Sequence, residues 1–192
     1  DYGKDSYAVL LYEFSRDLPN YFSGLATDLR AYDLTALTRF NAENASRELR
    51  RFDQSIFLKA LALADSEQDY NRKRAATRKA MRNDGLDKLF TEHRLDFLMG
   101  TTTGPAWKID WTNGDAFYGP SMAGPAAVAG NPHITLPLTE IDGLPMGISL
   151  IGKRMQDDRL VAFAELLVKA HGAIDWRRRI EEARARQVSG GG

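Results

Sequence analysis

The chain has 192 residues, of which 43% are hydrophobic and 27% are charged, and this composition predicts one globular domain with a core. Its 26 basic and 26 acidic residues cancel, so no overall positive field draws it to nucleic acid or to an anionic membrane. The lack of cysteine excludes disulfides, thiolate metal sites and a cysteine nucleophile, and no apolar run approaches the roughly 20 residues that span a bilayer.

The chain opens at Asp1 without an initiator methionine or a signal-peptide pattern, which we interpret as a cut or processed start. From there to about residue 95 the pattern is helical. The first predicted helix has one apolar stripe at spacings of three and four, formed by Leu11, Phe14, Leu18, Phe22 and Leu25. Pro19 lies inside this stripe, and we expect it to kink or split the helix.

Three more helices are expected before the predicted strands begin. Asp33 or Thr35 should cap a short second helix, because both side chains accept hydrogen bonds from backbone N–H groups at helix starts. Ile56 and Leu61 mark the third helix. The fourth covers residues 66–83, which are strongly charged and only weakly apolar.

Strand signals follow after His93. Residues 96–99 are a short apolar run that predicts a buried strand, and residues 133–137 and 146–151 predict two more strands, joined by a turn at Asp142 and Gly143. Between them, residues 100–131 are rich in glycine, proline and small side chains, which indicates long loops around a short helix.

A closing helix is predicted from the helical spacing of Leu160, Phe163, Leu167 and Ala170, with Asp157 or Asp158 as its cap. Three strands alone make a poor sheet with unpaired edges. We therefore expect these strands to belong to a larger sheet whose other strands lie upstream, and we expect their apolar edge to be exposed or covered by self-association.

The loop after the first strand holds the residues that we predict to bind a substrate. Two tryptophans supply apolar walls and several polar side chains supply orienting groups, as a small-molecule pocket requires. These predicted residues are Trp107, Asp110, Trp111, Asn113, Asp115 and Phe117. The alternative is that both tryptophans fill the core, and the pattern alone does not separate the two interpretations.

Ser121 offers another candidate chemistry. The sequence GPSMA at residues 119–123 is one residue away from the nucleophile elbow G-x-S-x-G, and Asp142 and His171 follow in the chain order of an α/β-hydrolase. A poor strand before Ser121, and alanine where the strained turn needs glycine, count against the elbow. We expect Ser121 to be a helix N-cap instead.

Metal and nucleic-acid sites are not predicted. His93, His133 and His171 are far apart and lack metal-ligand spacing, and we interpret His133, inside a predicted strand, as a hydrogen-bonded core or pocket histidine. Two basic clusters, at residues 72–82 and 177–179, have acidic neighbours. Such neighbours indicate solvated helix faces with local ion pairs.

Residues 119–152 carry a resemblance to a known family. The stretches AGNPHITLP at 129–137 and GLPMGISLIG at 143–152 resemble the C-terminal block of amidase-signature enzymes, and the likeness extends from about residue 7 to 171. It implies the C-terminal part of an α/β/α mixed-sheet fold: a helical first half, then a few strands and closing helices. We expect one domain over residues 1–187 and a flexible tail at 188–192.

The same resemblance implies a function and a missing part. Family members hydrolyse amides with a Ser–Ser–Lys triad and no metal or cofactor, but none of the nine serines here adjoins another and no Gly-Gly precedes the terminal tail. We therefore expect a cytoplasmic amidohydrolase for small carboxamides or peptide-terminal amides, whose triad comes from an N-terminal segment of the same enzyme. The alternatives are a non-catalytic binding or scaffold domain descended from an amidase, and a hydrolase that uses Ser121.

Overall fold

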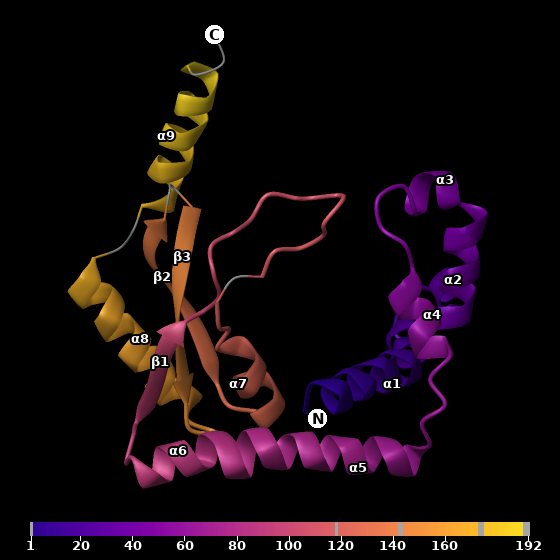
Figure 1. The fold of residues 1–192 in the computed structure, drawn as a ribbon, viewed down its shortest axis with the longest axis horizontal. Helices are drawn as coiled ribbons and strands as arrows, with labels where there is room; N and C mark the ends of the chain where they lie inside the picture. The colour runs from indigo at the N-terminus through magenta and orange to yellow at the C-terminus, as the bar shows by residue number, and fades with distance from the viewer. Residues whose placement is uncertain (1, 118, 142–143, 173–174, 190–192) are drawn as a thin grey trace. The chain divides into compact units, whose positions relative to one another are not determined.

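The computed structural model describes residues 2–117, 119–141, 144–172 and 175–189, in two compact units, Asp1–Ala80 and Met81–Gly192. The first unit contains α1 (Tyr2–Ser23), the 3₁₀ helix η1 (Thr27–Leu29), α2 (Leu34–Glu43), α3 (Ala45–Glu48), α4 (Ser55–Leu61) and α5 (Glu67–Arg78). The π-helix η2 (Lys79–Leu86) leads into the second unit, which contains α6 (Asp87–Glu92), β1 (Phe97–Thr101), α7 (Ala123–Ala129), β2 (His133–Ile141), β3 (Leu144–Gly152), α8 (Asp157–His171) and α9 (Trp176–Ser189) (Figure 1). The prediction of a single domain over residues 1–187 is not tested by this division.

Helix α1 packs through the predicted apolar stripe. Leu11 is buried in a cluster with Leu34 and Ala60, and partly buried apolar side chains surround this cluster, namely Phe14, Leu18, Phe57 and Leu63. The helix continues past Pro19 to Ser23, so the expectation that proline splits it is wrong. Proline removes only its own hydrogen-bond donor, and the helix ends within about one turn of it, so little of the ladder is lost.

The helix starts of the first unit follow ordinary capping chemistry. The side chain of Asp33 accepts a hydrogen bond of 2.7 Å from the backbone N–H of Ala36, which confirms Asp33 rather than Thr35 as the cap of α2. Helix α5 begins with a reciprocal pair of hydrogen bonds between Ser66 and Asp69. The four-residue helix α3 has no apolar periodicity and was not predicted.

The charged fourth helix is longer than its predicted range of 66–83. It continues from α5 through η2 and α6 to Glu92. Leu86 and Phe90 in this extension are buried in a cluster with Ala126, Ala129 and Ile151, and tertiary packing therefore extends the helix beyond its charged part.

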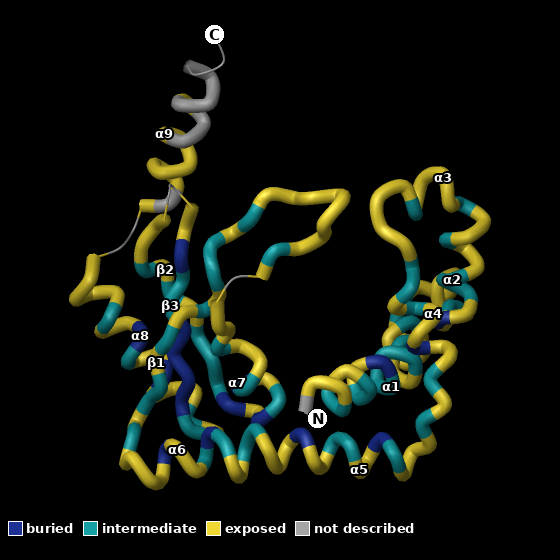
Figure 2. Tube along the Cα trace, viewed as in Figure 1, coloured by how far each residue is buried: buried dark blue, intermediate teal, exposed yellow. Residues whose placement is uncertain are grey.

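The sheet of the second unit has three strands in the order β1-β3-β2, and both pairings are antiparallel. In the register, Ser149 of β3 lies opposite Gly100 of β1 and Thr135 of β2. The central strand β3 is covered on both sides, whereas Met99 of β1 is 61% exposed (Figure 2). The expectation of a buried first strand is thus wrong, because β1 is an edge strand. The predicted turn at Asp142 and Gly143 lies outside the described residues.

Successive residues of β3 enter different cores. Ile151 packs with α7 and the extension of the fourth helix, while Leu150 packs with Leu160 and Ala164 of α8. Phe97 of β1 stacks on Phe163 of α8 with ring centroids 4.4 Å apart. The sheet therefore lies between two helical layers, and this arrangement fixes the ends of the strands and the loops that leave them.

The closing helices differ in detail from expectation. Helix α8 begins after Gln156, whose side chain makes no capping hydrogen bond, so the expected caps Asp157 and Asp158 lie in its first turn instead. There they still complement the positive end of the helix dipole. Helix α9 was not predicted, and its Arg179 pairs with Glu140 of β2 at 2.7 Å. Residues 190–192 of the expected tail lie outside the described residues.

Candidate functional site

The loop between β1 and α7 contains the six predicted substrate-binding residues, and Asp110 shapes its tip. Oδ1 of Asp110 accepts hydrogen bonds of 2.9 Å from the backbone N–H groups of both Thr112 and Asn113, and Oδ2 accepts one of 2.8 Å from the side-chain amide of Asn113. Gly114 completes the turn with a positive φ of 79°, a conformation that glycine adopts without steric strain. These contacts bring Asp110 and Asn113 together as a local turn.

The same hydrogen bonds set the charge state of Asp110. The backbone N–H of Asn113, then its side-chain amide and the backbone N–H of Thr112, stabilise the ionised carboxylate and lower the pKa of Asp110 below its ordinary value. Asp110 is therefore an anion at neutral pH whose oxygens are already occupied by the loop itself. A substrate amide or amine would have to share these acceptors.

A second local group forms lower in the loop. The indole N–H of Trp107 donates to Oδ1 of Asp115 at 3.2 Å, and the ring of Trp107 lies 4.7 Å from the ring of Phe117. Trp107 is partly buried, whereas Phe117 is 75% and Trp111 is 56% exposed. The alternative that both tryptophans fill the core is therefore unsupported for Trp111. The loop presents apolar rings outward beside fixed polar groups, and its role in binding stays a prediction.

A row of hydroxyl groups that the sequence analysis missed crosses the sheet at the base of this loop. Nε2 of His133 lies 2.6 Å from Oγ of Ser149, the Ser149 hydroxyl donates to Oγ1 of Thr102 at 3.0 Å, and the Thr102 hydroxyl donates to Oγ1 of Thr135 at 3.4 Å. Since a hydroxyl has one proton to donate, Ser149 accepts from an Nε2–H group of His133. The interpretation of His133 as a hydrogen-bonded histidine is confirmed.

This hydroxyl row links neighbouring strands of the sheet. Ser149 has no exposed surface, so no substrate reaches its hydroxyl as a nucleophile. Gly147 lets the two threonines meet, because a Cβ atom at this position would lie 2.8 Å from the Thr135 methyl group and 2.9 Å from Oγ1 of Thr102. The signal available in the sequence was the period-2 spacing of His133 with Thr135 and of Gly147 with Ser149, which places each pair on one face of a strand.

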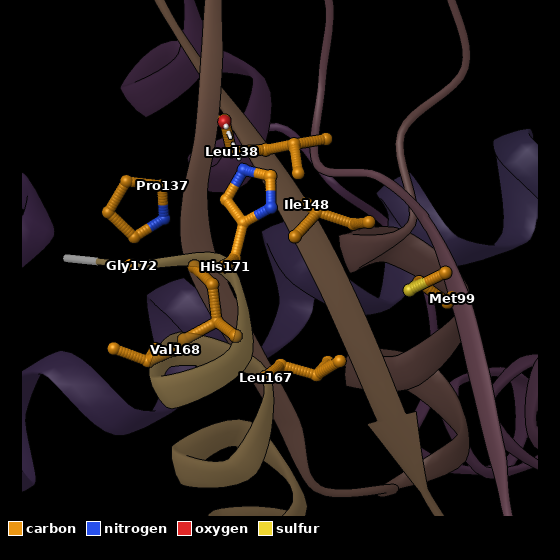
Figure 3. A pocket seen from close by; sticks show the side chains of 9 residues that line it. Met99, Pro137, Leu138, Ile148, Leu167, Val168, His171 and Gly172 are labelled. Atoms are coloured by element: carbon orange, nitrogen blue, oxygen red, sulfur yellow. Dashed lines mark hydrogen bonds between the residues drawn. The ribbon is translucent and has the colours of Figure 1, made fainter. Parts of the chain in front are cut away.

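An apolar pocket on the other face of the sheet was also missed. It has a volume of about 320 Å³ and is lined by all three strands and by the end of α8, through Met99, Leu136, Pro137, Leu138, Ile148, Leu167, Val168, His171 and Gly172. His171 is one of these lining residues, and its Nε2 lies 3.3 Å from the carbonyl oxygen of Leu138 (Figure 3). The pocket is at the small end of the range for ligand sites.

The Ser121 elbow is not supported by these contacts. Residues 115–117 are not a strand, and the Ser121 hydroxyl accepts a weak hydrogen bond of 3.4 Å from the backbone N–H of Ala123. The N-cap residue of α7 is Met122, so the expectation that Ser121 is the N-cap is wrong, and Ser121 lies one residue before the cap. His171 bonds to a backbone carbonyl, and Asp142 lies outside the described residues.

The basic clusters have acidic partners. On α5, Arg72 pairs with Asp69, Lys73 with Asp65, and Arg74 with Glu13; on α9, Arg178 pairs with Glu182. These ion pairs agree with the prediction of solvated helix faces. In the described ranges no group of three or more acidic, histidine or cysteine side chains is placed to hold a metal ion. No helix in that part of the chain has the length and apolar character needed to cross a membrane.

Comparison with known proteins decides the family. The family model described as Amidase matches residues 3–161, which is most of the chain. The chain belongs to the amidase-signature family. Curated amidase-signature relatives include the A subunit of glutamyl-tRNA(Gln) amidotransferase from Lactobacillus acidophilus, 27% identical over 175 residues, and from Pseudomonas savastanoi pv. phaseolicola, 30% identical over 189 residues. The alignments cover 87% and 92% of this chain but only 35% and 36% of those proteins.

Solved amidase-signature structures give the same result. The native peptide amidase of Stenotrophomonas maltophilia is 32% identical with a TM-score of 0.78, over 88% of this chain and 34% of its own. The peptide amidase PAM in complex with the competitive inhibitor chymostatin is 34% identical with a TM-score of 0.78, over 89% of this chain and 35% of its own. The predicted family and fold class are thereby confirmed, and the chain spans about a third of the length of the relatives it matches.

Proposed function

We propose that this chain is the C-terminal segment of an amidohydrolase that cleaves small carboxamides or peptide-terminal amides. The observation that carries the proposal is the match of nearly nine-tenths of the chain to peptide amidase structures at 32–34% identity. The segment supplies scaffold and part of the substrate pocket. The nucleophile, the bridging serine and the lysine base belong to the part of the enzyme outside these residues.

The loop between β1 and α7 is the part of this segment that meets the substrate. It combines the exposed rings of Trp111 and Phe117 with the ordered carboxylate of Asp110, and a ligand site needs such apolar walls and orienting polar groups. In this proposal the rings hold the non-reacting part of the amide. Binding there positions the scissile carbonyl against the nucleophile.

A second candidate function is favoured by the curated relatives, which are components of amidotransferases. Amidase and amidotransferase chemistry both break an amide C–N bond and differ in what receives the released group. The parent of this segment would then take the amide of one substrate and pass its nitrogen to another, and a pocket for a free amino-acid amide would replace one for a peptide amide.

The test compares the 192-residue chain with the full product of its gene. Ammonia release would be measured from a peptide with a C-terminal amide, from benzamide and from glutamine. We expect the full product to release ammonia from the peptide amide and the 192-residue chain to release none. Release from glutamine alone would favour the amidotransferase, and no release from any substrate would favour a binding or scaffold domain. If the 192-residue chain releases ammonia and its Ser121→Ala variant does not, the hypothesis that Ser121 is a nucleophile would be supported.

A further inference from the structure

The apolar pocket is a feature of the second unit that the proposed function does not use. Two of its lining residues, Leu136 and Ile148, lie opposite each other on β2 and β3. Thr135 and Ser149 of the hydroxyl row each adjoin one of them in the sequence, and adjacent side chains of a strand point to opposite faces of the sheet. The pocket therefore lies on the face away from the hydroxyl row, and away from the base of the loop that we propose to bind the substrate.

The walls of the pocket are almost entirely apolar. Among the described residues that line it there is no aspartate, glutamate, lysine or arginine, and His171 has the only side-chain nitrogen or oxygen. Met99 and Val168 are nevertheless 61% and 37% exposed, so a ligand that covers them gains the favourable burial of apolar surface. The pocket volume is about 320 Å³. Since an apolar cavity of roughly 150 Å³ holds benzene, there is room for a substituted ring.

His171 supplies this pocket with one hydrogen-bond acceptor. Its Nε2 bonds to the carbonyl oxygen of Leu138, and because a carbonyl can only accept, Nε2 carries the proton. In a neutral imidazole the other nitrogen, Nδ1, is then an acceptor. Figure 3 shows this second ring nitrogen turned toward Ile148, which also lines the pocket. Within the described part of the chain, no residue makes a hydrogen bond to Nδ1.

We infer that this pocket binds a small uncharged molecule that has an apolar body and one hydrogen-bond donor, as a phenol has. The apolar body contacts Met99 and Ile148, and the donor bonds to Nδ1 of His171. A charged ligand would lose its hydration without gaining a partner of opposite charge from these walls. A ligand without a donor would displace water from Nδ1 and leave this acceptor unpaired. The inference goes beyond the proposed function and does not rest on it.

The experiment titrates phenol, toluene and benzoate into the 192-residue chain. Nuclear magnetic resonance would follow the methyl signals of Met99 and Ile148 at about pH 8, where an ordinary imidazole is neutral. Phenol and toluene share a ring, but only phenol has a donor, and benzoate is charged. We expect phenol and toluene to shift both methyl signals in a saturable manner and benzoate to leave them unchanged. The fitted dissociation constants of phenol and toluene are then compared between variants.

Two substitutions assign the ligand to the pocket and its donor to His171. His171→Phe keeps a flat ring without a nitrogen, so it should weaken phenol binding about fivefold or more and change the dissociation constant of toluene by less than about twofold. Val168→Trp should fill the pocket and abolish the binding of both molecules. The matched control is Val161→Trp, because Val161 is also an exposed valine of α8 but is not one of the lining residues. Circular dichroism would check that each variant is folded.

The inference would be overturned if phenol shifted neither methyl signal, if benzoate bound as tightly as phenol, or if His171→Phe weakened phenol and toluene alike. An equal effect of Val168→Trp and Val161→Trp would also overturn it. So would a failure of phenol to bind the full gene product, because the rest of the chain would then fill the pocket. Phenol has no amide bond, so ammonia release from a peptide amide tests the proposed function separately. Phenol should leave the KM for that amide unchanged, and a rise would place phenol in the substrate site instead.

Discussion

Asp110 is the residue whose environment links the sequence to the candidate site most directly. Its side chain organises the backbone of the following residues, and three donors hold its carboxylate in the ionised form. Trp107 and Asp115 pair in the same loop. At the residue scale, then, the structure shows loop side chains held by local hydrogen bonds, and in the proposed function such order lowers the entropic cost of substrate binding.

The pKa of Asp110 predicts how the loop responds to acid. Because the folded value is lowered, the turn is fully stabilised above the ordinary aspartate pKa of about 3.9, and this stabilisation is lost as the pH falls through the lower, folded pKa. The backbone N–H shifts of Thr112 and Asn113 should therefore stay constant from pH 7 to about 4 and change only below that. Nuclear magnetic resonance of the 192-residue chain measures these shifts. The Asp110→Asn variant should lack the acid transition, and a transition above about pH 5 in the unmodified chain would contradict the assignment.

Trp111 tests whether the loop recognises substrate. In the full gene product, Trp111→Ala should lower kcat/KM more for large amides than for small ones, because its ring would hold the non-reacting part. Its stability loss should stay well below the roughly 3–5 kcal/mol of a buried aromatic truncation, since the side chain is 56% exposed. The matched control is Phe163→Ala, which truncates a ring packed between α8 and the sheet. An equal loss for every amide that tracks the melting temperature would remove Trp111 from recognition.

At the element scale, helical spacing of apolar residues predicted the first helix and helix α8, and short apolar runs bounded by turn signals predicted the strands. These patterns did not predict features that depend on contacts between segments far apart in the sequence. Helix α6 forms because Leu86 and Phe90 meet Ala126 and Ala129, which lie far along the chain from them. The edge position of β1 and the hydroxyl row likewise depend on which strands become neighbours, and a local pattern contains no information on that pairing.

Gly147 is the position where strand geometry leaves least room. Gly147→Ala should lower the free energy of unfolding by about 1–3 kcal/mol, because its Cβ would overlap Thr135 and Thr102 and spread the strands. Denaturant unfolding of the 192-residue chain measures the change. Gly124→Ala in α7 is the control: a Cβ there meets nothing within 4 Å, so better helix propensity should stabilise the protein by up to about 1 kcal/mol. Equal effects of the two substitutions would show that close packing at Gly147 is unimportant.

On the scale of the whole molecule, the chain combines a net charge of zero with a structure that leaves one sheet edge unprotected. The chain spans about a third of the length of the relatives it matches. Family and fold class were predictable from the sequence because the 119–152 block is specific. The substrate was not predictable, because the loop residues that would select it indicate apolar and polar contacts but not the chemical group that they bind.

Association of the isolated chain should depend on pH in a characteristic way. With a sequence pI of about 7.0, charge repulsion between copies is weakest near neutrality and grows on either side. Sedimentation should therefore show the most association near pH 7 and less at about pH 5.5 or 8.5. Met99→Lys should reduce association at neutral pH more than the control Met155→Lys does, because only the first change charges the β1 edge. This prediction would be contradicted if sedimentation showed the same degree of association at every pH and in the Met99→Lys variant.

The buried hydroxyl of Ser149 also bears on how the sheet avoids misfolding. Ser149, Leu150 and Ile151 are all fully buried. Burial of apolar side chains alone therefore does not determine which face of the sheet each residue occupies. A hairpin paired one residue out of step would turn Ser149 toward Leu160 and Ala164, where its hydroxyl would have no partner. Leaving a buried hydroxyl unpaired costs about 1–3 kcal/mol, enough to make the slipped hairpin a minor species. The hydrogen bonds of Ser149 with His133 and Thr102 therefore favour the observed register over one shifted by a single residue.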